Sequence, residues 1–314
     1  AFNPACYNIN DGSIQLFPTD TVFTSFSWNN GDSTAFIDNL QPGNYYVAVN
    51  KLSCYDSLSF TIDSADSIFI SETHSDVLCY GNSDGIININ ALGGTENFTY
   101  MLNGLAYNTN NFNLLPAGNY SIYVIDSISC LSDTLNILIN EPDTIITNGI
   151  LTNVSCYDQT DGAINLSTIG GTIPYTFVWN SSDSGFTNPG TEDLSSLDSG
   201  YYTVTITDLN GCNYDTTLII TQPPDIYIIT NIISHVDCNG NGNGSIDAIL
   251  SGGTAPLTPL WSIISPGGGL IPGNEDQNTL DGGTYQLLVT DGNGCADSTQ
   301  VTINEPAQLT GVTN

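Results

Sequence analysis

Cysteine is the residue type in this sequence with the clearest chemistry. Eight cysteines form four successive pairs, whose members stand 48, 51, 56 and 57 residues apart. Such a regular set is typical of disulfides made in an oxidising compartment. Zinc ligation is disfavoured, because no Cys-x-x-Cys motif exists and the two histidines do not recur at matching positions. We therefore expect disulfides at Cys6, Cys54, Cys79, Cys130, Cys156, Cys212, Cys238 and Cys295.

The sequence leaves the partner of each cysteine open. Base rates favour pairing within each repeat, where a disulfide would stabilise the domain by about 4 kcal/mol in the chain-entropy model. The rival is pairing between neighbouring repeats, such as Cys6 with Cys130. If strands alternate in direction, the first cysteine follows strand one and the second follows strand six. These positions are at opposite ends of a sandwich, which is too far for a bridge.

Oxygen-bearing side chains crowd the turn that follows the first cysteine of each repeat. Asp11, Asp84 and Asp161 stand in these turns beside asparagines, and such oxygen ligands suit Ca²⁺. Asp and Asn also occupy tight turns for backbone reasons alone. The turn explanation is favoured, because the fourth repeat has only asparagines there and the EF-hand pattern is absent. Calcium is the one metal considered, and no other cofactor is expected.

Catalysis has little support. A serine triad would need one of two histidines, His74 and His235, which both fall in segments predicted to be first strands, and no Gly-x-Ser-x-Gly motif exists. The abundant carboxylates are explained by repeat turns. Recurring aromatics share one strand position and are expected in the core instead of on a sugar-binding surface: Trp28, Tyr100, Trp179 and Trp261. We predict no catalytic residue, no cofactor-binding residue and no enzyme activity.

Charge excludes whole classes of partner. The 314 residues contain one basic side chain, Lys51, and 32 carboxylates, for a formal net charge of −31. Nucleic-acid binding is excluded, because it requires Lys and Arg to neutralise phosphates, and an anionic bilayer is disfavoured for the same reason. No apolar run is long enough for a membrane-spanning helix, so membrane insertion is not expected. Gly, Asn, Asp, Ser and Thr beside Ile, Val and Tyr indicate an all-β chain.

Self-similarity decides the architecture. A motif of Cys, four residues, Asp-Gly or Asn-Gly, one residue and Ile recurs with a period of 73 to 82 residues, at residues 6–14, 79–87, 156–164 and 238–246. Alternating runs, Gly-Gly-Thr turns and a Leu-x-x-Gly-x-Tyr corner follow within the period. This order indicates an immunoglobulin-like sandwich of roughly seven strands, with the tyrosine tying the corner.

We predict four tandem Ig-like or PKD-like β-sandwich domains in an elongated rod, over residues 1–64, 65–141, 142–223 and 224–305. The first domain lacks most of its first strand, and residues 306–314 would serve as the first strand of a further repeat. Joining the two ends restores the usual Pro-to-Cys spacing. The chain is thus expected to be one period of a longer array, either covalently continuous or built by strand donation in trans. The alternative is that the termini are merely frayed.

The assembled motifs resemble the SprB-type repeat. They include Thr-Asp-x-Asn-Gly-Cys at residues 207–212 and 290–295, and the Gln-Pro or Glu-Pro junctions. The resemblance covers nearly the whole chain and is weakest in the first repeat, which lacks Gly-Gly-Thr and the Thr-Asp motif. That family occurs in giant surface adhesins of gliding bacteria exported by type IX secretion. It implies an extracellular, cell-surface filament for adhesion or gliding motility, without catalytic residues.

The resemblance also implies glycosylation. In bacteria of this kind, Asp followed by Ser or Thr and a small or apolar residue accepts an O-glycan. Such triplets are more frequent here than composition predicts, and a glycoprotein would be shielded from proteases and edge pairing. The acceptors expected are Thr21, Ser33, Ser57, Ser64, Ser67, Ser127, Thr134, Thr144, Thr216 and Ser298.

Two functional classes stay open. In the first, the domains are spacers of a structural fibre, and the partners are other copies arranged end to end. In the second, each domain is an adhesin module that binds glycans or a surface. Binding modules should show enlarged loops with exposed aromatics. Only residues 181–193 and 265–277 are enlarged, and both are poor in aromatics, so the spacer is favoured.

Overall fold

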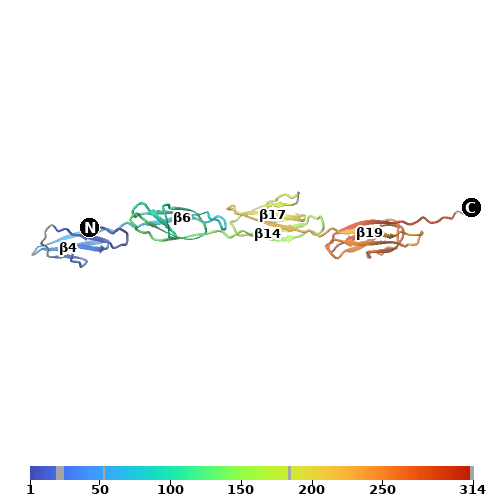
Figure 1. Ribbon diagram of the computed structural model, residues 1–314. Coiled ribbons are helices and arrows are strands. Elements are labelled where there is room, and N and C mark those ends of the chain that lie inside the picture. The colour runs from blue at the N-terminus through green and yellow to red at the C-terminus, as the bar shows by residue number, and fades with distance from the viewer. Residues whose placement is uncertain (19–24, 52–53, 183–184, 312–314) are drawn as a thin grey trace. The chain divides into compact units, whose positions relative to one another are not determined.

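A computed structural model of the chain describes residues 1–18, 25–51, 54–182 and 185–311. Every regular element in these ranges is a β-strand (Figure 1), which confirms the all-β prediction. None of the described segments forms a helix long and apolar enough to cross a membrane. The strands divide among the four repeats in chain order.

The first two repeats contain twelve of the named strands. Repeat 1 has β1 (Gly12–Gln15), β2 (Ser25–Trp28), β3 (Phe36–Leu40), β4 (Gly43–Lys51) and β5 (Cys54–Ile62). Repeat 2 has β6 (Phe69–Ser75), β7 (Gly85–Leu92), β8 (Thr99–Leu102), β9 (Leu105–Tyr107), β10 (Asn111–Leu115), β11 (Gly118–Ile125) and β12 (Leu135–Ile139).

The last two repeats follow one plan. Repeat 3 has β13 (Ile146–Thr152), β14 (Gly162–Ile169), β15 (Thr176–Ser181), β16 (Leu194–Leu197), β17 (Gly200–Thr207) and β18 (Asn213–Ile220). Repeat 4 has β19 (Tyr227–Ser234), β20 (Gly244–Ser251), β21 (Thr258–Ile263), β22 (Gln277–Leu280), β23 (Gly283–Thr290) and β24 (Ala296–Ile303).

Each repeat is a sandwich of two antiparallel sheets. In repeat 3 the orders are β13-β14-β16 and β15-β17-β18, and repeat 4 has the matching β19-β20-β22 and β21-β23-β24. Repeat 2 has β10-β7-β6 and β12-β11-β8-β9. Repeat 1 has β2-β4-β5 but only the pair β1-β3. This is the immunoglobulin-like arrangement that the alternating runs predict.

The prediction of roughly seven strands per repeat matches repeat 2, and the described parts of the other repeats have one or two strands fewer. The described residues form five strands in repeat 1, seven in repeat 2 and six in repeats 3 and 4. The described residues of repeats 3 and 4 form no counterpart of β9, because the loops between β15 and β16 and between β21 and β22 are rich in Gly and Pro. Proline removes a ladder donor and glycine weakens a strand, so these loops stay irregular.

Repeat 1 has no counterpart of the first strand found in the other repeats. β6, β13 and β19 each pair along the second strand of their repeat. In repeat 1, Phe2 makes only an isolated bridge to Ser13. The incomplete first strand stays a prediction. Residues 307–311, which the sequence predicts to be a strand, are not in one here.

Alternation along the strands builds the cores. In β17, Tyr202, Val204 and Ile206 are buried, while the threonines between them face outward. The buried side chains of the described residues gather in four clusters, one in each repeat. By contacts the chain splits into two compact units, Ala1–Thr144 and Ile145–Asn314. The predicted domain boundaries stay predictions.

The recurring aromatics lie in these cores, as predicted. Trp28, Trp179 and Trp261 are at most 3% exposed, and Tyr100 packs against its cluster while partly buried. Each indole N–H donates to a backbone carbonyl, for example from Trp179 to Thr191 at 2.9 Å. A buried indole that has found an acceptor is a core element and offers no face to a sugar.

The corner tyrosines also lie as predicted. In every repeat the hydroxyl of this tyrosine donates to the carbonyl four residues earlier, at the turn before the strand. The pairs are Tyr45 with Gln41 at 2.9 Å, Tyr120 with Pro116 at 2.8 Å, Tyr202 with Asp198 at 3.0 Å and Tyr285 with Asp281 at 2.8 Å.

Candidate functional site

The first cysteine of each repeat opens a tight turn between the first and second strands. The carbonyl of the cysteine accepts from the N–H three residues later, as in Cys6 with Ile9 at 3.2 Å and Cys156 with Gln159 at 3.2 Å. The residue two after the cysteine has a positive φ, and Asp158 is an example at 61°. Asn, Asp and Gly tolerate this conformation, which explains their presence there.

The predicted calcium carboxylates hold these turns closed. Asp11 accepts the N–H of Ala5 at 3.0 Å, Asp84 that of Leu78 at 3.1 Å, and Asp161 that of Ser155 at 2.9 Å. In repeat 4, Asn243 accepts the N–H of Asp237 at 3.2 Å. An amide oxygen accepts as a carboxylate does. The fourth repeat thus needs no carboxylate at this position, and the backbone explanation accounts for all four turns.

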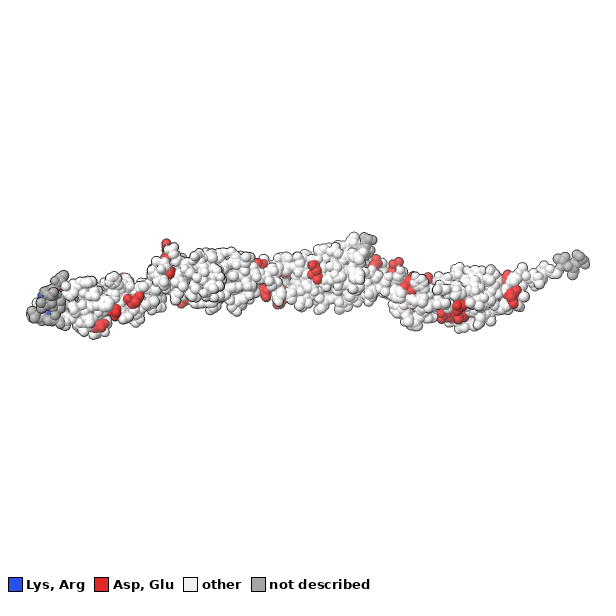
Figure 2. All heavy atoms as spheres, in the orientation of Figure 1, with Lys and Arg blue, Asp and Glu red and all other residues white. Residues whose placement is uncertain are grey.

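Metal-binding geometry does not accompany these turns. Within the described ranges, no group of three or more His, Cys, Asp or Glu side chains could hold a metal ion. Figure 2 shows carboxylates in small groups scattered along the visible face, with no single acidic patch. The hydrogen bonds from Ser155 hold the pKa of Asp161 below its ordinary value. This carboxylate therefore stays charged while it caps the turn.

The second cysteine lies in another turn, which a buried aspartate organises. Asp208 is 5% exposed. One of its oxygens accepts the N–H groups of Asn210 and Cys212, both at 2.9 Å. The other accepts the N–H of Thr172, at 2.8 Å, from the Gly-Gly-Thr turn. Asp126 and Asp291 make the same three contacts in repeats 2 and 4.

These aspartates were missed as functional residues, although both motifs that they join are visible in the sequence. The Asp of Thr-Asp-x-x-Gly-Cys and the Thr of Gly-Gly-Thr form one unit. Repeat 1 lacks both motifs together, which could have signalled that they act together. Gly94 and its equivalents leave room for this contact, because a Cβ on Gly171 would lie 2.8 Å from the Asp208 carboxylate.

The three N–H donors decide the charge state of the buried carboxylates. Burial alone would raise the pKa of Asp126, but hydrogen bonds from Thr95, Cys130 and Ile128 outweigh it and hold that pKa below its ordinary value. The pKa of Asp291 is also lowered, with burial opposed by the N–H groups around it. Each carboxylate is therefore charged in the folded chain over the neutral pH range.

The disulfides join neighbouring repeats. Cys6 of repeat 1 is bonded to Cys130 of repeat 2, with their Cα atoms 5.3 Å apart. Cys156 of repeat 3 is bonded to Cys295 of repeat 4, with Cα atoms 5.6 Å apart. Pairing within each repeat, the favoured prediction, is wrong. The physical reason is the one given for the rival: within one sandwich the two turns lie at opposite ends.

Six of the eight cysteines that the sequence predicts to be oxidised are in disulfides in this structure. Cys79 takes part in a disulfide, and so does Cys212. Cys54 and Cys238 are free, exposed thiols. They are the second cysteine of repeat 1 and the first cysteine of repeat 4.

The last strand of each repeat ends beside the first cysteine turn. Glu141 accepts the N–H of Gly81 at 2.7 Å, and Gln222 accepts that of Asp158 at 3.0 Å. Glu305 makes the equivalent contact in repeat 4. In repeats 2, 3 and 4 the Glu-Pro or Gln-Pro junction thus fixes the point where the chain leaves the repeat beside its first cysteine turn.

Small clefts flank the two bonded junctions. A cleft of about 330 Å³ beside the Cys6–Cys130 disulfide is lined by Tyr7, Ile68 and Leu131 among others. One of about 150 Å³ beside the Cys156–Cys295 disulfide includes Tyr157 and Ile226. At both junctions the sulfur of the second cysteine also lies near a backbone carbonyl, that of Ala5 at 3.3 Å or Ser155 at 3.4 Å.

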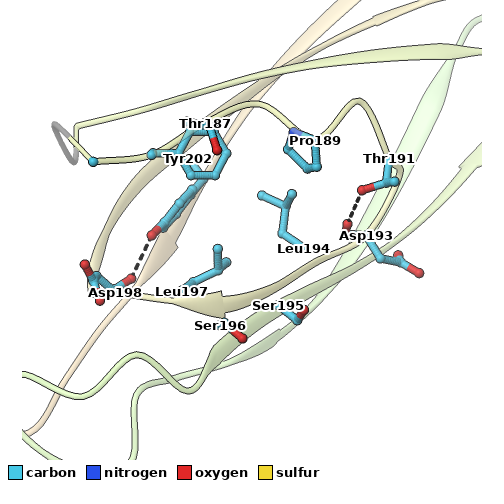
Figure 3. A pocket seen from close by; sticks show the side chains of 12 residues that line it. Thr187, Pro189, Thr191, Asp193, Leu194, Ser195, Ser196, Leu197, Asp198 and Tyr202 are labelled. Carbon is cyan, nitrogen blue, oxygen red and sulfur yellow. Dashed lines mark hydrogen bonds between the residues drawn. The ribbon is translucent and has the colours of Figure 1, made fainter.

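The largest loop of repeat 3 covers a separate pocket of about 350 Å³ (Figure 3). Phe186 packs edge-on against the ring of Tyr202, with centroids 5.6 Å apart. Figure 3 shows Pro189 and Leu194 on the same wall. The Tyr202 hydroxyl and the Thr191 hydroxyl both donate to backbone carbonyls of the loop. The pocket offers more polar than apolar surface, because hydroxyl and carboxylate side chains make up much of its lining.

The predicted glycosylation sites are mostly accessible. Thr21 lies outside the described residues. Ser67 and Thr216 are half-buried, and the other seven acceptors are exposed: Ser33, Ser57, Ser64, Ser127, Thr134, Thr144 and Ser298. Glycosylation stays a prediction. His74 lies in β6, as predicted, whereas His235 lies just after β19 and its ring accepts the N–H of Asn304 at 3.1 Å.

The sequence profile of the SprB repeat matches residues 71–106, 148–184 and 230–263. The chain contains SprB repeats. Each match starts in the first strand of a repeat and extends past the first cysteine turn into the strand that carries the core aromatic. The matches lie in repeats 2, 3 and 4, where the SprB motifs are most complete. No curated protein sequence matches the chain.

Solved structures of tandem immunoglobulin domains are similar to these SprB repeats in fold. The N-terminal eight Ig domains of DSCAM match 97% of this chain at 9% identity and a TM-score of 0.30, and the chain spans 59% of that structure. Sidekick-1 domains 1–5 match 97% of this chain and 77% of that structure, at 13% identity and a TM-score of 0.29. An I-band fragment of titin matches 77% of this chain and 99% of that structure, at 13% identity and a TM-score of 0.37.

Proposed function

We propose that this chain is a stalk segment of a secreted filament on a bacterial surface, in which the SprB repeats are spacers. The observation that carries this proposal is the pairing of Cys6 with Cys130 and of Cys156 with Cys295. A disulfide within a domain stabilises that domain. A disulfide between domains restrains the junction and determines how a pulling force passes along the chain.

The pairing makes a chain that resists extension. A pull on the two termini passes through the Cys6–Cys130 bond, so the 124 residues between these cysteines cannot be drawn out while the bond is intact. The Cys156–Cys295 bond protects 139 residues in the same way. A spacer whose length must hold under load benefits from this property. A catalytic or signalling module has no need of it.

Composition supports an extracellular place for this stalk. Disulfides persist in oxidising surroundings. One basic residue in the whole chain leaves trypsin-like proteases a single cleavage site. Surface-exposed proteins carry SprB repeats, and Ig-like repeats of this type are usually structural or adhesive modules. The role in gliding motility, export by type IX secretion and assembly with other copies all belong to this proposal.

Force spectroscopy on single full-length chains tests the proposal. Each extended residue adds about 3.5 Å of contour length. Adding a reductant should release about 430 Å from the loop closed by Cys6–Cys130 and about 490 Å from the other. The oxidised chain should show neither step, and a Cys238→Ser variant should behave as the wild type. An oxidised chain that unravels repeat by repeat to its full contour would refute the stalk.

Adhesion by glycan binding is the second candidate, and the pocket beneath the loop of repeat 3 is the feature that favours it. Phe186 and Pro189 line this pocket, and a sugar ring can stack against the ring of Phe186. A glycan array probed with the full chain tests this role. Binding that disappears in Phe186→Ala and persists in Leu105→Ala, an exposed site in β9, would support it.

A further inference from the structure

The two free cysteines, Cys54 and Cys238, occupy positions at which other repeats have a disulfide-bonded cysteine. Cys238 is the first cysteine of its repeat, as are Cys6 and Cys156, which are bonded to the following repeat. Cys54 is the second cysteine of its repeat, as are Cys130 and Cys295, which are bonded to the preceding repeat. Cys238 therefore has the position of a cysteine that bonds to a following repeat, and Cys54 that of one that bonds to a preceding repeat.

The turn at Cys238 already has the conformation of a bonded junction. The N–H of Asn241 donates to the Cys238 carbonyl at 3.0 Å, as Gln159 does to Cys156 at 3.2 Å. Asn243 caps the preceding N–H of Asp237, and Glu305 accepts the N–H of Gly240 at 2.5 Å. No rearrangement is needed for Cys238 to present its sulfur to a second cysteine turn.

An exposed leucine points to the same junction independently of the thiols. Ile145 and Ile226 each stand three residues after a junction proline, and both are 6% exposed in the core of the following repeat. Leu309 stands three residues after Pro306 and is 98% exposed. It has the position and the apolar character of a first core residue, but no core around it. Burying a leucine gains about 1.5–3 kcal/mol.

In repeat 1, the strand edge that the first strand covers in the other repeats is mostly unpaired. Its β1 pairs with β3 on one side and is paired on the other side only at Ser13, by the bridge to Phe2, whereas β7, β14 and β20 each lie between two strands. The open edge of β1 is where β6, β13 and β19 lie in the other repeats. An open edge with unpaired backbone groups accepts an added strand. Repeat 1 thus carries both the free Cys54 and the strand edge to which the segment around Leu309 can pair.

We propose that successive copies of this chain join through a disulfide between Cys238 of one copy and Cys54 of the next, with the segment around Leu309 added to the open edge of β1. This inference rests on the stalk function and names its copy-to-copy junction. It repeats, between copies, the bond that Cys6 and Cys130 make within the chain. The filament is then continuous in covalent bonds, whether or not the copies share one polypeptide.

The bond forms by two thiol–disulfide exchanges. The Cys238 thiolate attacks an oxidising disulfide such as oxidised glutathione, forms a mixed disulfide and releases one thiol. The Cys54 thiolate of the next copy attacks the Cys238 sulfur and releases a second thiol. Two protein thiols are oxidised, and the small disulfide is reduced by the same two electrons. The two protons go to the released thiols.

Complementary serine variants test the pairing, and both replace exposed thiols that are free in the chain. In a glutathione redox buffer, the wild type should give a ladder of oligomers on non-reducing gels. A mixture of Cys238→Ser and Cys54→Ser should stop at a heterodimer, which peptide mapping should show to be Cys54 bonded to Cys238. A mixture of only symmetric dimers, with like cysteines bonded, would overturn the proposal.

Leu309 provides the second readout. Leu309→Asp should slow ladder formation by about tenfold or more, because the junction loses one buried leucine. Leu105→Asp, at another exposed leucine, should have no effect. Equal rates for both variants and the wild type would overturn the role of the added strand.

A head-to-tail fusion of two chains distinguishes a next copy in the same polypeptide from a next copy that is a separate subunit. Cys238–Cys54 bonding in the fusion but no ladder from single chains assigns the junction to one continuous polypeptide, and a ladder assigns it to separate subunits. Free thiols in both samples would overturn the proposal. That result would leave the Cys6–Cys130 bond, and with it the force test of the stalk, unaffected.

Discussion

Cys156 of repeat 3 is bonded to Cys295 of repeat 4 across 139 residues of sequence. The bond joins the first cysteine turn of one sandwich to the second cysteine turn of its neighbour. In a Cys156→Ser/Cys295→Ser double variant, we expect the unit formed by repeats 3 and 4 to lose up to about 5 kcal/mol in the chain-entropy account. Thermal unfolding followed by calorimetry measures the loss. Cys238→Ser is the matched control, and an equal shift in the control would contradict the account.

The buried aspartate that joins two turns should be essential to its repeat. Asp208→Ala leaves the N–H groups of Thr172, Asn210 and Cys212 without their acceptor, and all three of these hydrogen bonds are partly buried. We expect a loss of about 2–3 kcal/mol in chemical denaturation. Asp215→Ala, at an exposed position in β18, should cost less than about 0.5 kcal/mol. Similar losses in the two variants would show that the Asp208 contacts are unimportant.

Acid should weaken the same turns. Asp126 and Asp291 have pKa values below the ordinary 3.8, so their charged forms favour the folded state. Their contribution is complete well above pH 3.8 and is lost as the pH falls through the lowered values in the folded chain. The net charge of −31 is neutralised in the same range and acts in the opposite direction.

A comparison with Asp126→Asn/Asp291→Asn isolates the effect of the two carboxylates from that of the net charge. The difference in melting temperature between wild type and variant should be largest near neutral pH and should shrink below about pH 4. A difference that stays constant from pH 7 to pH 2 would mean that these charges do not contribute.

The corner tyrosine should stabilise its repeat through one hydroxyl. Tyr202→Phe removes the donor to the Asp198 carbonyl and keeps the buried ring, which is 1% exposed. We expect a cost of about 1–2 kcal/mol. Tyr201→Phe, one residue earlier and 59% exposed, is the control and should be near neutral. If the two variants unfold at the same denaturant concentration, the corner bond contributes nothing.

The glycine that begins the second strand is required by close packing. A Cβ on Gly244 would lie 2.9 Å from the Leu280 carbonyl and 2.7 Å from the Ile303 side chain. Gly244→Ala should therefore destabilise repeat 4 by about 1–3 kcal/mol. A Cβ on Gly273 meets nothing within 4 Å, so Gly273→Ala should be tolerated. Equal stability of the two variants would show that the strand has room for a methyl group there.

Features that depend on local sequence could be predicted. The period, the corner tyrosine and the core position of Trp179 follow from motifs only a few residues long. The irregular loops of repeats 3 and 4 were harder, because a loop rich in Gly and Pro has no periodicity to read. Asp208 and Thr172 are far apart in sequence, and their contact depends on how two turns meet in space.

The cysteine pairing could not be decided from the sequence. Spacing alone permits both Cys6–Cys54 and Cys6–Cys130. The choice depends on which end of a sandwich each turn occupies, and on whether the next repeat places its second cysteine turn beside that end. Only the folded pair of repeats, where Cys6 meets Cys130, contains this information.

Disulfide mapping of the full chain tests the central claim most directly. Digestion with an acid protease under non-reducing conditions avoids exchange between thiols, and mass spectrometry then identifies the linked peptides. We predict linked peptides that contain Cys6 with Cys130 and Cys156 with Cys295. Peptides that link Cys6 with Cys54 and Cys156 with Cys212 would place every bond within one repeat and contradict the account.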